Sequence, residues 1–400
     1  MIKCTAVALG GDNMNIKSDT EKTIIDVVDE FDYSTQNQNY NNSFIKWRKN
    51  KKNPFAFNFS TNKKESLFIE GKGFINNSAD LSERETINKI FFILGISMLI
   101  WVLIDNVISK MFIGFLDIME VNIHTKFFST SYYGGSIEIV TAMIIITLMK
   151  IYIPVLYLHY KLKMPLKVEF MSTMNHPTEL INSIAMTLII CTIITIPDVY
   201  SSSAKEIYSY FKSIDTDISV WGQAEYVIYT IFDVIVLSIS TEILFRGAIF
   251  SALRQFGDVF AVIVTSVTAS LLTQNFQDMP AVLLISVVAS VGMLKSGSIF
   301  TAFAVSVVFK MYQLTIVIIE SSCSENMFFI RNFVMIAIFV ASTITIAILH
   351  IIKRNNKKKC FAEYHSEISM KERLIYSFKM FPFSAVSLIC IIASVIKVIY

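Results

Sequence analysis

Residues 240–257 read STEILFRGAIFSALRQFG and lie inside an otherwise apolar part of the chain. The stretches on either side, residues 227–239 and 260–272, are almost wholly apolar. Glu242 and Arg246 are four residues apart, which places both on one face of a helix with the acid before the base, the favourable order. A charge surrounded by apolar groups is costly unless it is paired. We therefore expect a helix that carries a Glu242–Arg246 ion pair.

The composition outside this stretch is that of a membrane protein. Of the 400 residues 54% are hydrophobic and 17% are charged, whereas a soluble protein has about 25% charged residues. Apolar runs of about 20 residues recur, and this length crosses a bilayer. We predict an all-α polytopic membrane bundle of about eight to nine transmembrane helices. The nine candidate runs are residues 90–108, 137–158, 180–196, 226–245, 259–273, 281–294, 299–319, 328–352 and 381–398.

Four regions follow from this pattern. Residues 1–87 form a polar, largely disordered tail, because they bury too little apolar surface to offset the entropy of ordering. Residues 88–223 carry the N-terminal membrane helices, residues 224–320 a central core, and residues 321–400 the C-terminal membrane helices. Two runs, 259–273 and 281–294, are shorter than a full crossing, so one of them is expected to be tilted, broken or re-entrant.

Loop charges predict the orientation. Basic residues occupy alternate loops, at 161–167, 246–254, 295 and 353–359, and acidic residues occupy the loops between them. By the positive-inside rule the basic loops and the N-terminus are cytoplasmic. We expect an integral protein of the bacterial inner (cytoplasmic) membrane, with the lipid bilayer as its surroundings.

One part of the tail is a candidate lipid-binding segment. Residues 46–52 contain five cations flanked by aromatic residues, a composition that suits an anionic membrane surface. A solvated run of charge is an equally good interpretation. The cations are Lys46, Arg48, Lys49, Lys51 and Lys52.

Other partners are not indicated. A net charge of +3 is too small to suggest a nucleic acid. The five cysteines are scattered and form no CxxC pair, and no histidine or cysteine pair has the spacing of metal ligands. We expect no disulfide framework, no metal site and no cofactor.

Two sequence blocks resemble the CPBP family, the CAAX prenyl endopeptidases and bacteriocin-processing proteins also called Abi. The first block of that family is Glu-Glu-x-x-x-Arg followed by Gly, an aromatic residue and a basic residue, and Glu242, Arg246, Gly247, Phe250 and Arg254 fit it. A later block, residues 292–310, resembles the segment in which a short turn opens a helix, with Gly297 in the turn and Ser298 as N-cap. The resemblance covers about 90 residues.

The resemblance implies an intramembrane endopeptidase. In the family, the first Glu and a His on the next helix activate a water molecule, and a His and an Asn on a third helix complete the site. This chain departs from that pattern at each of these positions. Thr241 replaces the first Glu, Gln274 replaces the His of the second block (Thr273 if the register shifts by one), and Ser306 and Lys310 replace the His and Asn of the third.

Three interpretations remain open. The first is a catalytically degenerate member, kept for binding a substrate or a membrane partner such as a membrane protein or peptide. The second is an active endopeptidase with displaced groups, for example Glu242 with His159 or His350. The third is an unrelated channel or transporter in which Glu242, Arg246, Lys310 and Asp233 line a polar path. The first predicts that Glu242, Gln274 and Ser306 surround a small cavity near the cytoplasmic face.

Overall fold

The computed structural model describes residues 38–50, 52–57, 67–69, 73–75, 79–125, 132–195, 203–214, 219–322, 327–353 and 368–399. Seven helices in these ranges are long and apolar enough to cross a membrane, or eight if one bent helix pair counts as a span. The all-α membrane bundle predicted from the sequence is confirmed. Of the nine candidate runs, residues 259–273 form a helix of only 14 residues, too short to span.

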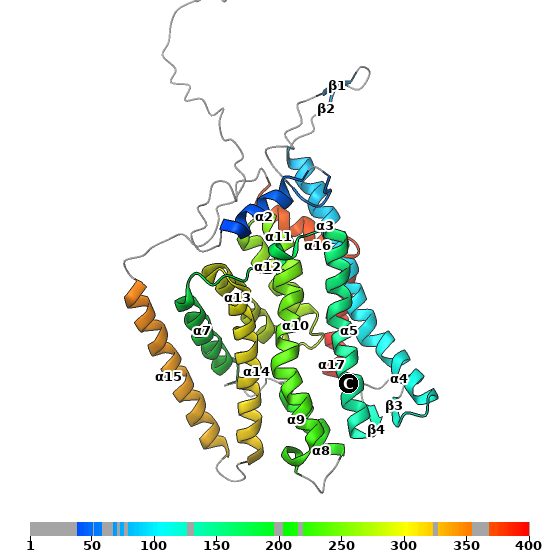
Figure 1. The fold of residues 1–400 in the computed structure, drawn as a ribbon, viewed down its shortest axis with the longest axis vertical. Helices are drawn as coiled ribbons and strands as arrows, with labels where there is room; N and C mark the ends of the chain where they lie inside the picture. Colours follow the sequence, from blue (N-terminus) through cyan, green and yellow to red (C-terminus); the bar gives the residue numbers. More distant parts are fainter. Residues whose placement is uncertain are drawn as a thin grey trace, which may run out of the picture.

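The helices run roughly parallel to one long axis (Figure 1). In chain order the elements of the first half are α2 (Gln38–Arg48), α3 (Ala79–Leu103), η2 (Ile104–Ile108), α4 (Ser109–Ile118), α5 (Ser136–Leu162), α6 (Leu166–Glu169), α7 (Pro177–Thr195) and α8 (Ser203–Ile214). Two antiparallel hairpins, β1 (Leu67–Ile69) with β2 (Gly73–Ile75) and β3 (Ile123–Thr125) with β4 (Tyr132–Gly134), lie among them. We call the end of the bundle that carries α2 and α16 the α2 end, and the opposite end the α8 end.

A continuous, irregular helix follows. It comprises α9 (Ala224–Ile231), η4 (Phe232–Leu237), α10 (Ser238–Glu242), η5 (Ile243–Phe250), α11 (Ser251–Leu253) and η6 (Arg254–Phe256), and the separate short turn η3 (Val220–Gly222) precedes it. The remaining helices are α12 (Asp258–Leu271), α13 (Met279–Ser296), α14 (Ile299–Ser322), α15 (Met327–Lys353), α16 (Met370–Lys379) and α17 (Phe383–Ile399). We refer to residues 224–256 as the central helix.

Two helix ends follow sequence signals. Gly297 has a positive φ of 77° and ends α13, and the Ser298 hydroxyl accepts a hydrogen bond from the Phe300 amide at the start of α14. The turn and N-cap predicted for these two residues are confirmed.

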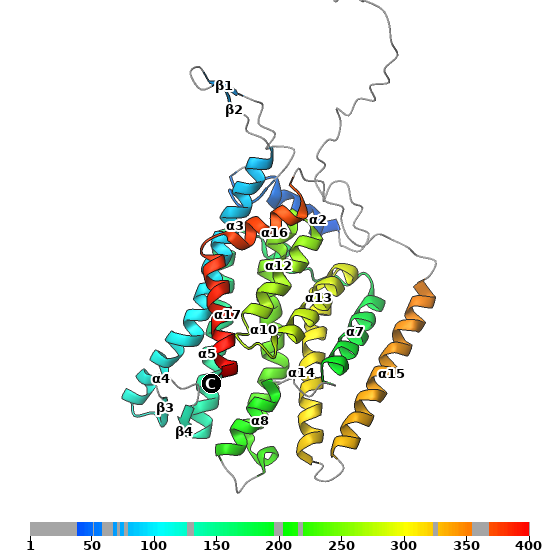
Figure 2. The same cartoon turned by 180° about the vertical axis from the view of Figure 1, so that it is seen from behind.

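Near the C-terminus of the described residues, α16 crosses the α2 end of the bundle and meets α17 at an angle of 76° (Figure 2).

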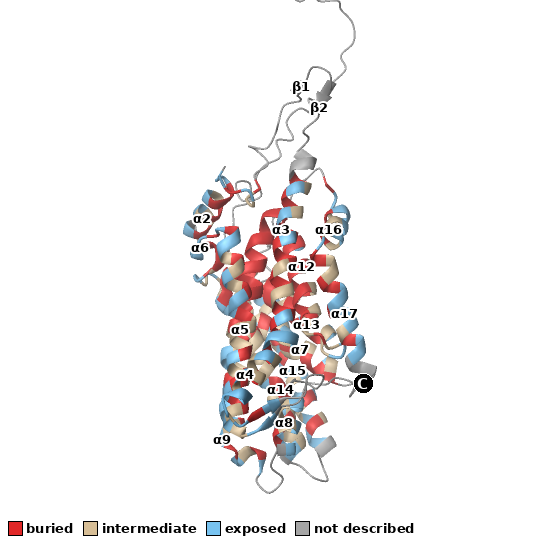
Figure 3. Ribbon diagram, turned by 90° about the vertical axis from the view of Figure 1, so that its right-hand side faces the viewer, coloured by how far each residue is buried: buried red, intermediate tan, exposed pale blue. Residues whose placement is uncertain are grey.

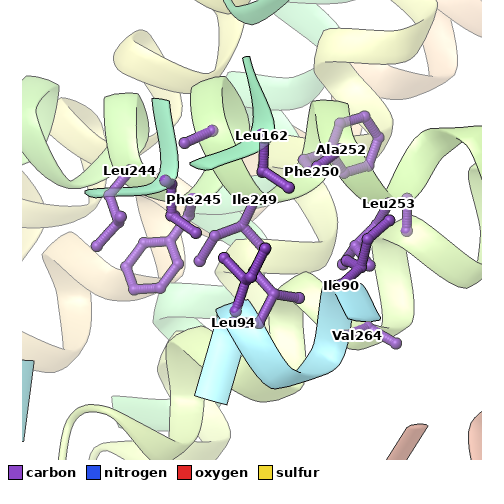
Figure 4. Packing of buried hydrophobic residues seen from close by; sticks show 14 of the residues in the cluster. Ile90, Leu94, Leu162, Leu244, Phe245, Ile249, Phe250, Ala252, Leu253 and Val264 are labelled. Carbon is purple, nitrogen blue, oxygen red and sulfur yellow. The ribbon is translucent and has the colours of Figure 1, made fainter. Parts of the chain in front are cut away.

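The largest apolar core lies between the central helix, α3, α5 and α12. Leu94, Phe245, Ile249 and Phe250 all belong to this core, part of which is drawn in Figure 4. Buried residues concentrate along these helices, whereas α17 and the outer faces of the bundle are more exposed (Figure 3). Exposed apolar side chains on the outer faces are what a lipid-facing surface requires.

The structure differs from the predicted disordered tail at residues 38–57. Here α2 packs against α6, and Phe44, Trp47 and Arg48 are buried. Arg48 donates to the carbonyl of Phe57, so this cation of the 46–52 segment faces the protein. Residues 1–37 lie outside the described residues. Of the cysteines, Cys191 and Cys390 are free and buried, and the other three are not described.

Candidate functional site

The central helix contains two π-helical segments that flank Glu242. The η4 segment ends at Leu237 and η5 begins at Ile243, so the ordinary α-helical turn of α10 that carries Glu242 lies between them. Each π turn adds a residue and rotates the helix beyond it, and such turns are frequent at functional sites. The side chains of Glu242 and Arg246 both point into the bundle and are buried.

Glu242 and Arg246 form the ion pair predicted from their spacing. Nη1 of Arg246 donates to Oε1 of Glu242 at 3.2 Å, and it lies 3.0 Å from Oε2. The hydroxyl of Ser306 on α14 donates to Oε1 of the same carboxylate. Nη2 of Arg246 donates to the carbonyl and the hydroxyl of Ser286 on α13, both at 2.7 Å. The pair therefore connects the central helix to two neighbouring helices.

A second ion pair lies further along the same helices. Nζ of Lys310 on α14 donates to Oδ1 of Asp233 in η4 at 3.1 Å. A lysine within an apolar helix usually meets an acid, because an unpaired charge there is costly. Asp233 and Lys310 thus neutralise each other beside the Glu242–Arg246 pair.

These residues line a cavity of ≈ 190 Å³ between α3, the central helix, α12, α13 and α14. For scale, an engineered protein cavity of 150 Å³ binds benzene. Most of the wall is apolar, and its polar part comprises Ser238, Thr241, Glu242, Arg246, Thr273, Ser286, Ser306 and Lys310. Trp101 of α3 closes one side.

Three buried polar atoms of the lining residues have no hydrogen-bond partner among the described residues. They are Nε1 of Trp101, Nε of Arg246 and Oε2 of Glu242, whose 3.0 Å contact with Nη1 of Arg246 is an ion pair rather than a hydrogen bond. Two are donors and one is an acceptor. Buried polar groups normally have partners, so unpaired groups around a cavity indicate that a bound molecule or water completes them.

The structure brings most of the sequence-predicted site residues together. Thr241, Glu242, Arg246, Ser306 and Lys310 all line the cavity. Gln274 does not. Its φ of 50° places it in the turn after α12, where it is buried and its side-chain oxygen accepts from Asn106 of η2 at 3.2 Å.

The second block instead contributes Thr273 to the cavity, together with Ala269 one turn earlier. These are the two residues that the shifted register of the second block assigns. Sequence reasoning missed Trp101 and Ser286, which touch the site from α3 and α13. Trp101 has no local signal, while Ser286 stands as a hydroxyl within the apolar run 281–294.

The two histidines considered as displaced bases do not line the cavity. His159 is near the end of α5, where its Nδ1 lies 2.7 Å from Oε1 of Glu169 in α6. Burial raises the pKa of the Glu169 carboxyl, and His159 partly opposes this effect. His350 belongs to α15, which packs on α7 and α14 at the periphery of the bundle.

The cavity lies in the part of the chain that matches a known protein family. Residues 223–312 match the family model of the type II CAAX prenyl endopeptidases, Rce1-like. This Rce1-like segment comprises the central helix, α12, α13 and the first half of α14, and it contains all the lining residues except Trp101. The match confirms the resemblance to the CPBP family for 90 of the 400 residues.

No curated protein and no solved structure gives a match to the chain. The similarity to that family therefore rests on residues 223–312 alone. In the part of the chain that the structure describes, no three His, Cys, Asp or Glu side chains gather as a metal site would require.

Proposed function

We propose that this CAAX-protease-like membrane protein has lost hydrolysis and uses the cavity of its Rce1-like segment to bind a peptide segment of a substrate or membrane partner. The observation that carries the proposal is the chemistry of the cavity wall. The positions where the family resemblance implies the catalytic Glu, two His and Asn are occupied by Thr241, Thr273, Ser306 and Lys310, which are neutral or cationic.

Two of these replacements remove the means to activate water. Neither Thr241 nor Thr273 titrates near neutral pH, so neither accepts a proton from a water molecule. Loss of a general base typically costs about 10²–10⁴-fold in rate, and loss of an oxyanion donor about 10²–10³-fold. Little hydrolysis is expected to survive both.

Glu242 is a poor substitute for the missing base. Its Oε1 already accepts hydrogen bonds from Arg246 and Ser306, and the carboxylate is needed to neutralise a buried guanidinium. Protonating Glu242 during catalysis would leave Arg246 without its counter-charge in an apolar environment, which is strongly unfavourable.

Binding a peptide requires an apolar surface and hydrogen-bonding groups but no proton transfer, and the cavity wall has both of these features. Its largely apolar wall suits an apolar side chain or chain end, while Trp101 Nε1 and Glu242 Oε2 offer one donor and one acceptor. A peptide group has a complementary acceptor and donor, its C=O and N–H. Recognition without turnover is the function that these features support best.

The test is binding of a fluorescent prenylated peptide ending in a CAAX sequence to the full chain in liposomes. We expect saturable binding with the peptide recovered intact. Ala269→Trp, which fills the cavity from α12, should weaken binding, and the control Ile235→Trp, on an exposed face of the central helix, should not. Equal binding by both variants, or no binding by the unmodified chain, would contradict the proposal.

A further inference from the structure

A second, larger recess lies at the α2 end and is lined by residues outside the Rce1-like segment, although the carbonyl of its Phe55 accepts a hydrogen bond from Gln255 of that segment. It is an open groove of ≈ 460 Å³ between α3 and α5. Phe55, from the segment that follows α2, forms one side of it. Neither the family match nor the cavity described above includes any of its lining residues.

The charged part of the groove is basic. Lys89 of α3 and Lys161 of α5 both line it, and none of the lining residues is acidic. Both lysines are exposed, and neither forms a salt bridge within the described residues. The Lys161 ammonium lies 5.9 Å from the centre of the Tyr160 ring, a weak contact that leaves its charge available. Two cations from different helices therefore face the same recess.

The apolar part of the groove lies further along the same two helices. Phe92 and Ile96 follow Lys89 by one and two turns of α3, and Tyr157 precedes Lys161 by one turn of α5. At 1.5 Å per residue, the seven residues from Lys89 to Ile96 extend about 10 Å along the helix. The groove is thus basic at the end of the bundle and apolar toward its middle.

This order matches the order of groups in a phospholipid. The phosphate lies at the membrane surface and the acyl chain extends toward the centre of the bilayer, so phosphate would meet the lysines while the chain covers Phe92 and Ile96. Asn88 adds a buried side-chain oxygen with no hydrogen-bond partner among the described residues, which a headgroup hydroxyl can satisfy. Basic recesses between membrane helices are known to favour anionic headgroups.

We infer that the groove between α3 and α5 is a binding site for an anionic glycerophospholipid, with Lys89 and Lys161 holding the phosphate. The site also gives a role to the ordered segment after α2, because Phe55 forms part of the wall. The inference is independent of whether the cavity of the Rce1-like segment binds a peptide.

The experiment is a lipid titration of the purified full chain in detergent, followed by native mass spectrometry. Phosphatidylglycerol and phosphatidylcholine with identical acyl chains are compared. The test variant is Lys89→Gln with Lys161→Gln. The control is Lys371→Gln with Lys379→Gln, two exposed lysines on α16 at the same end, which removes the same charge away from the groove.

We expect phosphatidylglycerol to bind the unmodified chain more tightly than phosphatidylcholine does. Each cation contributes about 1 kcal/mol to the binding of an anionic lipid, so the test variant, which lacks two, should bind phosphatidylglycerol about 30-fold more weakly. The affinity of the control variant for phosphatidylglycerol should stay within about 3-fold of that of the unmodified chain. Equal losses in test and control variants, or equal affinity of the unmodified chain for both lipids, would overturn the inference. Thermal unfolding in phosphatidylcholine alone checks that the test variant is folded.

Discussion

Breaking the Glu242–Arg246 pair should destabilise the bundle far more than removing it entirely. Glu242→Gln leaves a buried guanidinium with its hydrogen bonds to Ser286 but without a counter-charge. Arg246→Met leaves a buried carboxylate whose remaining donor is Ser306. In both single variants an uncompensated charge stays in an apolar interior.

The size of the effect follows from the burial of both groups. The side chains of Arg246 and Glu242 are only 2% and 5% exposed, so water screens neither charge. Removing one partner of a buried ion pair costs about 3–5 kcal/mol, whereas replacing both with neutral groups of similar volume is often close to neutral. We expect each single variant to lose about 3–5 kcal/mol of unfolding free energy and the double variant to lose less than either.

Reversible unfolding of the four chains in mixed micelles measures these free energies. The double-mutant cycle then gives the coupling between the two side chains, which should exceed about 2 kcal/mol in favour of the pair. Additive losses, with the double variant as unstable as the sum of the two singles, would refute the idea that the pair fixes the helices around the cavity.

Three further outcomes are expected. Gly95→Ala should lose about 1–3 kcal/mol of unfolding free energy, because a Cβ at this position would collide with the backbone between α16 and α17. Gly114→Ala is the control and should keep its stability, because a Cβ at that position has no atom within 4 Å. Phe44→Ala, which removes a ring only 2% exposed, should release α2 and speed proteolysis between α2 and α3; an unchanged cleavage rate would contradict the packing. The pKa of Glu169 in the folded state is raised above its ordinary value of 4.5, so the stability that this carboxyl contributes is present below pH 4.5 and is lost as the pH rises through the folded-state pKa. Glu169→Gln should therefore flatten the pH dependence of the unfolding free energy in that range. An unchanged pH profile would contradict this.

The membrane helices were predictable because bilayer thickness demands long apolar runs, which composition alone reveals. The gathering of Thr241, Ser306 and Lys310 was predictable as well, because the family blocks carry their own spacing. The Glu242–Arg246 contact followed from helical geometry. These features depend on local sequence, and the structure places them as expected.

Other features depend on where a helix ends. Because α12 ends at Leu271, helical periodicity does not predict where the next side chains point, and Thr273 rather than Gln274 lines the cavity.

The packing of α2 was not predicted, because the composition of the sequence around it is polar. A signal was present, since Tyr40, Phe44 and Trp47 recur at helical spacing and all three are buried. Average composition conceals such a short amphipathic face.

The most direct measurement is peptide cleavage by the full chain reconstituted in liposomes, with Glu242→Gln as the paired sample. A prenylated CAAX peptide is incubated over many hours, and products are quantified by mass spectrometry. We predict that product formation in both samples equals that in protein-free liposomes. Turnover by the unmodified chain above that in protein-free liposomes would contradict the account, and its loss in a Glu242→Gln sample that is still folded would make Glu242 a working base.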